Sequence, residues 1–356
     1  MTVRFRERES GVEALRIVCM LLIIVHHMVY HGNAMSSPVL GNKVLSRFLF
    51  VGGQTGVNCF VLITGYFLAP FRARRFASVL GQTIFYSLGL TLAMKAAGWA
   101  SPTGQQIWDS ALVVSRGPYW FVTMYLGLNA LQPALQPLAR GMGKRAYQWV
   151  LGAGAVYLSL LPTITLARPA SPFFHNLTWF CYLYLLGAYF KKYPFRLAGS
   201  APLQAGIFLT MVALMALSSL WGEEHAELFQ QVASKHNFFS DKNTLPQLIC
   251  SCALFLLFSG RKNPAPRWLS LLSGASFGVY LIHDHSLFRA MLWGKWLKIW
   301  QASQTESFWL LTLLAPAGVY ALGTAVDLAR KYLLERPLLA RLEPLFGRLD
   351  GWLAQE

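Results

Sequence analysis

Apolar residues run along this chain in long stretches that are separated by short polar segments. Ten stretches lie near residues 13–31, 47–69, 79–98, 118–138, 146–166, 176–191, 202–221, 244–260, 267–287 and 306–333. A helix needs roughly 20 residues to cross the hydrocarbon core of a bilayer. Most of the stretches are long enough, whereas 176–191 and 244–260 are short. The pattern predicts an all-α, polytopic membrane protein, a helical bundle with about ten transmembrane helices.

Composition supports the bilayer as the solvent and narrows the choice of partners. With 55% hydrophobic and 13% charged residues, the chain is too apolar for a single soluble core. The net charge of +16 would suggest nucleic acid only if the basic residues shared one face. They are spread over the loops, so we expect membrane lipids around the chain and no nucleic acid. The five cysteines lack metal-like spacing, so we expect no zinc site and no disulfide framework.

The distribution of positive charge predicts the orientation. If the amino terminus is cytoplasmic, the cytoplasmic segments hold 20 of the 31 lysines and arginines and the opposite segments hold nine. Positively charged residues favour the cytoplasmic side of a membrane. An even number of spans returns the chain to that side, so we expect both termini in the cytoplasm. The expected organisation is one transmembrane domain over residues 1–340 and a short cytoplasmic tail over 341–356.

The first stretch carries ionisable residues that a bilayer disfavours, which marks them as functional candidates. Arg16 and His27 are eleven residues apart, which on a helix gives a rotation of ~20° past three turns and a rise of ~16 Å. They therefore share a face with His31, whereas His26 points ~100° away. A histidine can take a proton from a hydroxyl at neutral pH, as acyl transfer to an alcohol requires. The alternative is a histidine that only bonds a neighbouring helix.

Several motifs then point to a family. Ten residues separate Arg16 from His27, and the second stretch contains Gly-Val-Asn-Cys-Phe-Val-Leu-Ile-Thr-Gly-Tyr-Phe over residues 56–67. Further motifs are Arg-Ala-Arg-Arg at 72–75, Tyr-Trp-Phe at 119–121, Ser-Phe-Gly-Val-Tyr-Leu-Ile-His at 276–283 and Glu-Arg-Pro at 335–337. With these motifs the chain resembles the acyltransferase-3 family of membrane-bound O-acyltransferases over essentially its whole length.

The resemblance implies transfer of an acyl group, most often acetyl, from cytoplasmic acyl-CoA to a hydroxyl of a surface glycan or its lipid-linked precursor. It also implies a bacterial inner (cytoplasmic) membrane, acetyl-CoA as donor and no metal. The family's catalytic pair falls on Arg16 and His27, with His27 as general base, and its paired loop arginines fall on Arg72 and Arg75. Many relatives have aspartate where this chain has Asn58. A carboxylate role is therefore not carried over, but Asn58 could bind an acceptor or a helix.

The residues themselves agree with this donor. Guanidinium groups match the phosphate oxygens of coenzyme A, and Arg72 and Arg75 lie on the expected cytoplasmic side, although they could equally serve only as topology signals. Because His27 lies ~16 Å deeper than Arg16 along a helix, the thioester would have to be threaded into the bundle. Arg16 would steady the donor or orient His27. Direct transfer and a relay through acylated His27 both stay open.

Further polar and aromatic residues are candidates for acceptor binding. His283 ends the ninth stretch, Trp120 and Tyr125 lie on the fourth, and His31 extends the stripe of the first. Aromatic faces suit sugar rings, but aromatic residues at a membrane interface are also common anchors. His283 could also only mark the water boundary.

Two other classes of protein fit the same pattern. A transporter or flippase for a lipid-linked glycan would need a similar bundle with buried charge, and a structural partner of a glycan synthase would need no chemistry. Transporters often show internal repeats and broken helices. The fourth stretch contains Pro133 and Pro137, but the chain shows no convincing halves. Binding of acetyl-CoA would separate the enzyme from both alternatives.

Overall fold

The computed structural model describes residues 8–116, 119–165, 172–194, 199–225, 227 and 239–353, and no strand occurs among them. The first half contains α1 (Ser10–His31), η1 (Ala34–Ser36), α2 (Leu40–Phe67), α3 (Ala73–Ala96), α4 (Gly104–Ala111), α5 (Trp120–Gly141), α6 (Lys144–Ala155), η2 (Val156–Leu160), α7 (Leu161–Thr165) and α8 (Pro172–Lys192). The second half contains α9 (Ala201–Glu224), α11 (Leu245–Ser259), α12 (Arg267–His283), α13 (Ser286–Arg289), η4 (Ala290–Trp296), α14 (Ile299–Ala302), α15 (Phe308–Arg330), η5 (Lys331–Glu335), α16 (Arg336–Arg341) and α17 (Glu343–Leu353).

Each of the ten apolar stretches coincides with a helix or a run of short helices, which confirms the all-α class. Among the described residues, five helices are long and apolar enough to cross a membrane: Ser10–His31, Leu40–Phe67, Ala73–Ala96, Ala201–Glu224 and Phe308–Arg341. The protein is therefore a multi-pass helical bundle. The stretch 244–260 forms a helix of only 15 residues, as its length indicates. The count of about ten crossings and the cytoplasmic location of both termini stay predictions.

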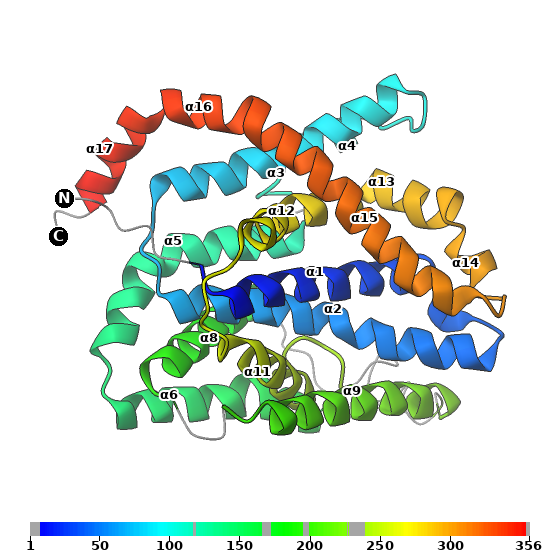
Figure 1. The fold of residues 1–356 in the computed structure, drawn as a ribbon, viewed down its shortest axis with the longest axis horizontal. Coiled ribbons are helices and arrows are strands. Elements are labelled where there is room, and N and C mark those ends of the chain that lie inside the picture. The colour runs from blue at the N-terminus through cyan, green and yellow to red at the C-terminus, as the bar shows by residue number, and fades with distance from the viewer. Residues whose placement is uncertain are drawn as a thin grey trace.

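The loops expected on the cytoplasmic side meet at one end of the bundle, which we call the inner end. Lys191 in the last turn of α8 is 3.3 Å from Glu9, which precedes α1. The segment after α2 meets the carboxy-terminal helix, since Arg74 forms an ion pair of 2.7 Å with Glu343 of α17. Figure 1 shows α17 and the loop between α2 and α3 at the same side of the molecule. The expected tail is thus a helix that contacts α3.

The loops expected on the opposite side meet at the other end, which we call the outer end. Lys43 of α2 is 3.2 Å from Glu223 at the end of α9, and the Ser37 hydroxyl donates to the carbonyl of Ser303 after α14. The long helices thus run back and forth between the two ends (Figure 1). The geometry follows the alternation that the loop charges predict.

Glycines bring the central helices α1 and α2 into close contact. A Cβ atom added at Gly53 would lie 2.2 Å from Cγ of His26, and one at Gly56 would lie 2.7 Å from the carbonyl oxygen of Cys19. Small residues at such positions let two helix backbones approach. The His26 ring packs on Phe50 and bonds its carbonyl at 2.5 Å. His26 therefore faces α2, away from the stripe of His27, as helical periodicity predicts.

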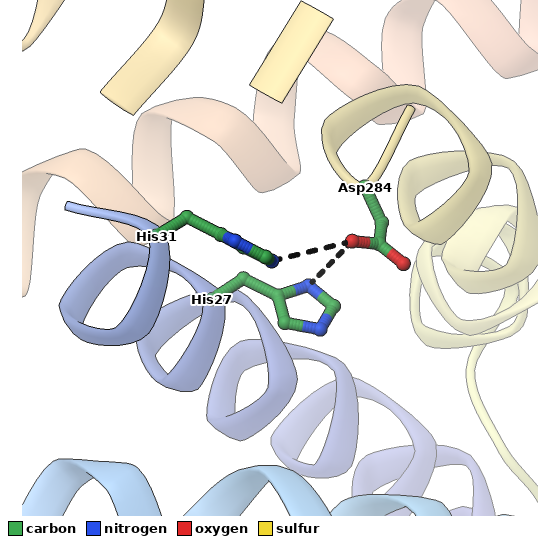
Figure 2. Close-up of side chains that lie close together, drawn as sticks. All are labelled: His27, His31 and Asp284. Atoms are coloured by element: carbon green, nitrogen blue, oxygen red, sulfur yellow. Dashed lines mark ion pairs between the residues drawn. The ribbon is translucent and has the colours of Figure 1, made fainter. Parts of the chain in front are cut away.

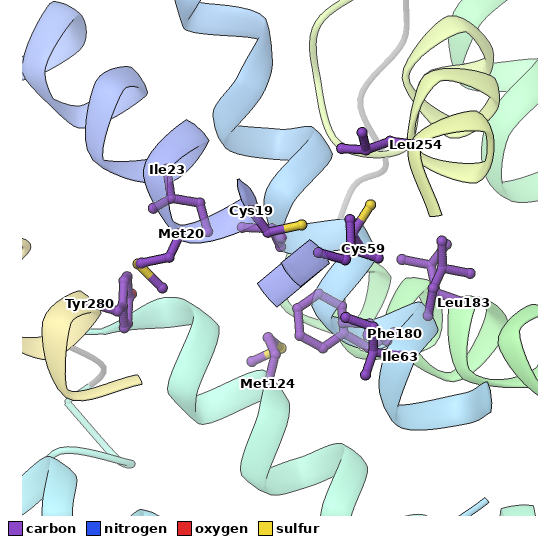
Figure 3. Packing of buried hydrophobic residues seen from close by; sticks show 14 of the residues in the cluster. Cys19, Met20, Ile23, Cys59, Ile63, Met124, Phe180, Leu183, Leu254 and Tyr280 are labelled. Carbon is purple, nitrogen blue, oxygen red and sulfur yellow. The ribbon is translucent and has the colours of Figure 1, made fainter. Parts of the chain in front are cut away.

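The core surrounds these two helices. Figure 3 shows Cys19, Met20 and Ile23 of α1 among side chains from α2, α5 and α8. All five cysteines lie in described residues and are free thiols. Cys19 and Cys59 are fully buried in this cluster. They act as small packing residues, which agrees with the absence of a disulfide framework expected from their spacing.

Candidate active site

The first-helix histidine stripe faces a cavity of about 660 Å³ near the outer end. His27 and His31 line this outer cavity together with Trp120 of α5, and Arg289 of α13 lies at its wall. Asn33 and Ser36 of the loop after α1 line it as well, which places its mouth at the outer end. His27 itself is largely enclosed, with 15% of its side chain exposed.

Residues at the end of α12 contact the His27 ring. Nδ1 of His27 is 3.0 Å from Nε2 of His283 and 3.6 Å from Oδ1 of Asp284. The same Asp284 oxygen is 3.7 Å from Nε2 of His31, so both histidines of the stripe converge on one carboxylate (Figure 2). Arg289 adds a guanidinium 3.1 Å from that oxygen. Two helices distant in the sequence thus build one charged cluster.

Hydrogen bonds in this cluster determine which ring nitrogen of His27 carries a proton. Nδ1 of His283 is 2.7 Å from the carbonyl oxygen of Val279, and a carbonyl only accepts, so this nitrogen carries the hydrogen. In neutral His283 the other nitrogen, Nε2, is then an acceptor. Nδ1–H of His27 must donate to it, which leaves the lone pair of His27 on Nε2. That lone pair is what a general base requires.

The same cluster raises the question of a metal. Ligand atoms of His27, His31 and Asp284 lie within 4.8 Å of one another, a spacing that could hold a metal ion. The sequence does not indicate it, because Asp284 is far from the two histidines along the chain. However, Arg289 already contacts the carboxylate and His283 already contacts Nδ1 of His27. A metal would have to displace both, so the donor set fits a metal poorly.

Arg16 lies near the start of α1, in a second cavity of about 290 Å³ toward the inner end. Its guanidinium is 2.9 Å from Oε1 of Glu13, a buried carboxylate that also accepts hydrogen bonds from Arg8 and Ser273. Arg16 lines this inner cavity and is absent from the lining of the outer one. None of its described contacts is with His27, so the structure shows no orienting contact between the two residues.

Four side chains line both cavities and separate them: Ile23, Val57, Phe121 and Tyr280. Each comes from a different helix, namely α1, α2, α5 and α12. We call this ring of side chains the collar. Arg75 lines the inner cavity and also a groove of about 510 Å³ at the inner end. Groove, inner cavity and outer cavity therefore follow one another through shared residues, as threading of a donor requires.

The inner groove contains both loop arginines. Arg72 is the N-cap residue of α3 and Arg75 lies in its first turn, as their spacing predicts. Asp350 of α17 accepts a hydrogen bond of 2.8 Å from the backbone N–H of Ala73, and its other oxygen is 3.6 Å from Arg72. A carboxylate thus occupies a helix amino terminus that is flanked by arginines, where backbone N–H groups and guanidinium groups both favour an anion.

The structure places Asn58 between helices, which is the second of the two roles, acceptor binding or a helix contact, that the sequence allows. Its side chain is fully buried and lines neither cavity. Its amide donates to the carbonyl of Lys242 and to the hydroxyl of Ser251, and its oxygen accepts from Trp179. The structure therefore assigns Asn58 to bonding between helices.

The other residues that were expected to bind the acceptor lie in different parts of the site. Trp120 lines the outer cavity, with the Lys242 ammonium 4.8 Å from its ring centroid. Tyr125 lines the inner cavity, not the outer one, and stacks on Phe121. His283 is fully buried and lines neither cavity. Its place is behind His27 rather than against an acceptor.

Asp284 and Arg289 complete the site, and the sequence gives only a weak signal for them. Asp284 follows the motif that ends at His283, at a helix end where an acidic residue could equally mark the water boundary. Nothing in the sequence places Arg289 beside it. Glu13 is easier to foresee, because it lies three residues before Arg16 and pairs at that spacing are common on helices.

The comparison with known families agrees with this arrangement. A family model described as an acyltransferase domain matches residues 9–326, which include α1, the collar and the whole outer cluster. The fold and this match define a membrane acyltransferase. The chain belongs to the acyltransferase-3 family. No curated protein and no solved structure matched the chain.

Proposed function

We propose that this protein moves an acyl group, in the first instance acetyl, from cytoplasmic acyl-CoA to a hydroxyl of a surface glycan or its lipid-linked precursor. The membrane would be a bacterial inner membrane. The observation that carries the proposal is the hydrogen bond between His27 and His283, because it leaves a lone pair on Nε2 of a histidine that lines the outer cavity. A base in this state can accept the proton of an attacking hydroxyl.

The inner groove suits the anionic end of the donor. Arg72, Arg74 and Arg75 line it together with Lys331 and Arg336. Guanidinium groups bind phosphate oxygens strongly, and Arg75 continues the lining into the inner cavity. With the phosphates in the groove, the long flexible arm of coenzyme A would follow the inner cavity past Arg16 and bring the thioester toward the collar.

The outer cavity suits the acceptor. Its volume of about 660 Å³ falls within the range of about 300–1,000 Å³ that is usual for small-ligand pockets. Trp120 offers an aromatic face, while His31 and Arg289 offer polar groups that could hydrogen-bond a sugar. A hydroxyl entering from the outer end would reach His27 from the side opposite to the donor.

The proposed chemistry is a direct transfer. Nε2 of His27 takes the proton of the acceptor hydroxyl as the oxygen attacks the thioester carbonyl. The new ester C–O bond forms and the C–S bond breaks, and the proton on His27 passes to the leaving thiolate sulfur. Asp284, 3.6 Å from Nδ1, stabilises the transient imidazolium, and Arg289 holds this carboxylate in place.

The test is acyl transfer by purified protein in lipid nanodiscs, with radiolabelled acetyl-CoA and the lipid-linked glycan fraction of bacterial membranes as acceptor. His27→Ala should lower the rate by about 10²–10⁴-fold, the usual contribution of a general base. His225→Ala is the matched control, since this partly buried histidine lies outside both cavities. Transfer by His27→Ala at the rate of the control would contradict the proposal.

Donor binding distinguishes the enzyme from a glycan transporter. Acetyl-CoA should raise the midpoint of thermal unfolding of the purified protein, and a coenzyme A analogue that lacks sulfur should do so through the phosphates alone. A protein that binds neither compound but moves a lipid-linked glycan across a vesicle membrane would instead be a flippase.

A further inference from the structure

The collar between the two cavities is apolar except for the Tyr280 hydroxyl, unlike the spaces on either side of it, which are lined by charged groups. Ile23, Val57 and Tyr280 are each less than a tenth exposed. The Phe121 and Tyr280 rings meet edge to face with centroids 5.7 Å apart. On the inner side the walls carry Arg16 and Arg75, and on the outer side they carry the charged cluster around Asp284. Any group that joins the two cavities must pass these four side chains.

The collar lies directly before the proposed base. Ile23 is one turn before His27 on α1, and the Tyr280 ring centroid is 6.4 Å from that of His27. In a donor that enters from the inner end, the acyl group is the leading part and the thioester follows it. When the thioester carbonyl comes within reach of a hydroxyl beside His27, the acyl group must therefore lie at the collar or just beyond it.

We propose that the collar selects the acyl group of the donor, admitting short, uncharged groups and excluding longer or charged ones. This proposal rests on the proposed function. A longer chain would have to project past the collar into the space of the acceptor. A succinyl group would have to bring its carboxylate into a collar whose only polar group is the uncharged Tyr280 hydroxyl, and burial of a charge without a cationic partner is costly. The two aromatic and two branched side chains of the collar cannot easily move apart, because packed interiors adjust poorly to added volume.

The shape of the walls supports a selective role over a purely packing role. A core side chain is enclosed by protein on every side, whereas each collar side chain borders open space both above and below. Val61, one turn after Val57 on α2, shows the contrast, since it is fully buried and lines neither cavity. The two valines therefore form a matched pair in which only Val57 should affect the donor.

The experiment compares acyl-CoA selectivity of purified protein in nanodiscs. Acetyl-, propionyl-, butyryl- and succinyl-CoA are offered at equal concentration with the lipid-linked glycan fraction of bacterial membranes, and the esters formed are counted by mass spectrometry. The wild type should favour acetyl over butyryl by tenfold or more, since one methylene in an apolar pocket discriminates by about 10–200-fold. Val57→Ala should raise the butyryl-to-acetyl ratio about tenfold.

Two further variants keep the test sharp. Val61→Ala removes the same two methyl groups one turn away and should leave the ratio unchanged. Val57→Ile adds a methyl group and should lower the propionyl-to-acetyl ratio, so a selectivity change is measurable even if the alanine variant unfolds. Succinyl transfer should stay low in every variant, because none of the substitutions adds a cationic partner for the carboxylate to the collar.

The outcomes separate this inference from the proposed function. If the wild type transfers none of the four acyl groups, the proposed function fails. If it transfers acetyl but Val57→Ala, Val57→Ile and Val61→Ala all keep the wild-type ratios, the function stands and the collar inference is overturned. Preferred transfer of succinyl by the wild type would also overturn it.

Discussion

The outer cluster and the inner groove differ in how their charged side chains are held. In the outer cluster His283 is fully buried and Asp284 is nearly so. Both contact His27, and Arg289 contacts Asp284, so the side chains around His27 are held in place. In the groove Arg72 has 58% of its side chain exposed and its ion pair with Asp350 spans 3.6 Å. A proton transfer needs fixed geometry, whereas an anion can be captured by charge before it is positioned.

Of the variants that test this contrast, His283→Ala should have the largest effect on the transfer rate. His283→Ala removes the acceptor of Nδ1–H, so His27 loses its fixed tautomer, and we expect the transfer rate to fall by about 10²-fold or more. His283→Gln offers an amide oxygen that can accept the same bond and should recover part of the rate. The measurement is kcat for labelled acetyl transfer, with the KM for acetyl-CoA unchanged. A large rise in this KM would instead assign His283 to donor binding.

Asp284 should have a smaller effect. Asp284→Asn keeps the shape but removes the charge that stabilises the His27 imidazolium. Loss of ~1.4 kcal/mol of this stabilisation would lower kcat about tenfold. Because a metal would depend on the same carboxylate, activity of the wild type is also measured after treatment with a chelator. Full activity in chelator together with the tenfold loss in Asp284→Asn supports a purely electrostatic role, while loss in chelator contradicts it.

In the groove we expect effects on binding rather than on chemistry. Arg75→Ala should raise the KM for acetyl-CoA about tenfold with little change in kcat, since a hydrogen bond to a charged group is worth about 1.5–3 kcal/mol. Added salt should raise the KM of the wild type and have less effect on the variant, because the lost interaction is screened by ions. A fall in kcat at unchanged KM would place Arg75 in the chemical step instead.

The smallest effect should come from Asp350. Asp350→Ala removes the carboxylate that caps α3 and pairs with Arg72. Loss of the cap should lower the free energy of unfolding by about 1 kcal/mol. Removal of a competing anion should at the same time lower the KM for acetyl-CoA a few-fold. Asp109→Ala on α4 serves as a charge-matched control for the KM, since this residue lines neither the groove nor either cavity. An increase in KM after Asp350→Ala would show that α17 helps to bind the donor.

Periodicity within one helix predicted how the polar side chains of α1 are placed, whereas contacts between distant helices could not be predicted. The spacing of Arg16, His27 and His31 correctly predicts one stripe, because helix geometry alone determines it. The partnership of His27 with His283 depends on how α12 packs against α1, and no local pattern encodes that.

Residues at the borders of the site show the same limit. The sequence could not show that Asn58 meets Trp179 and Ser251, so its polar side chain suggested a ligand contact where the structure has a bond between helices. It also could not show that a collar separates Arg16 from His27, since four helices contribute one side chain each.

The glycines of the bundle show which helices around the collar pack most closely. A Cβ atom at Gly65 would lie 2.0 Å from the Tyr184 carbonyl oxygen of α8, and one at Gly278 would lie 2.2 Å from Asp327 of α15. Together with the glycine contacts between α1 and α2, these contacts pack α1, α2 and α8 closely. They also bring α12 close to α15. Among the described contacts, no glycine of α5 lies this close to the backbone of another helix, and α5 contains two prolines. We therefore expect Phe121 on α5 to be the least firmly held of the four collar side chains.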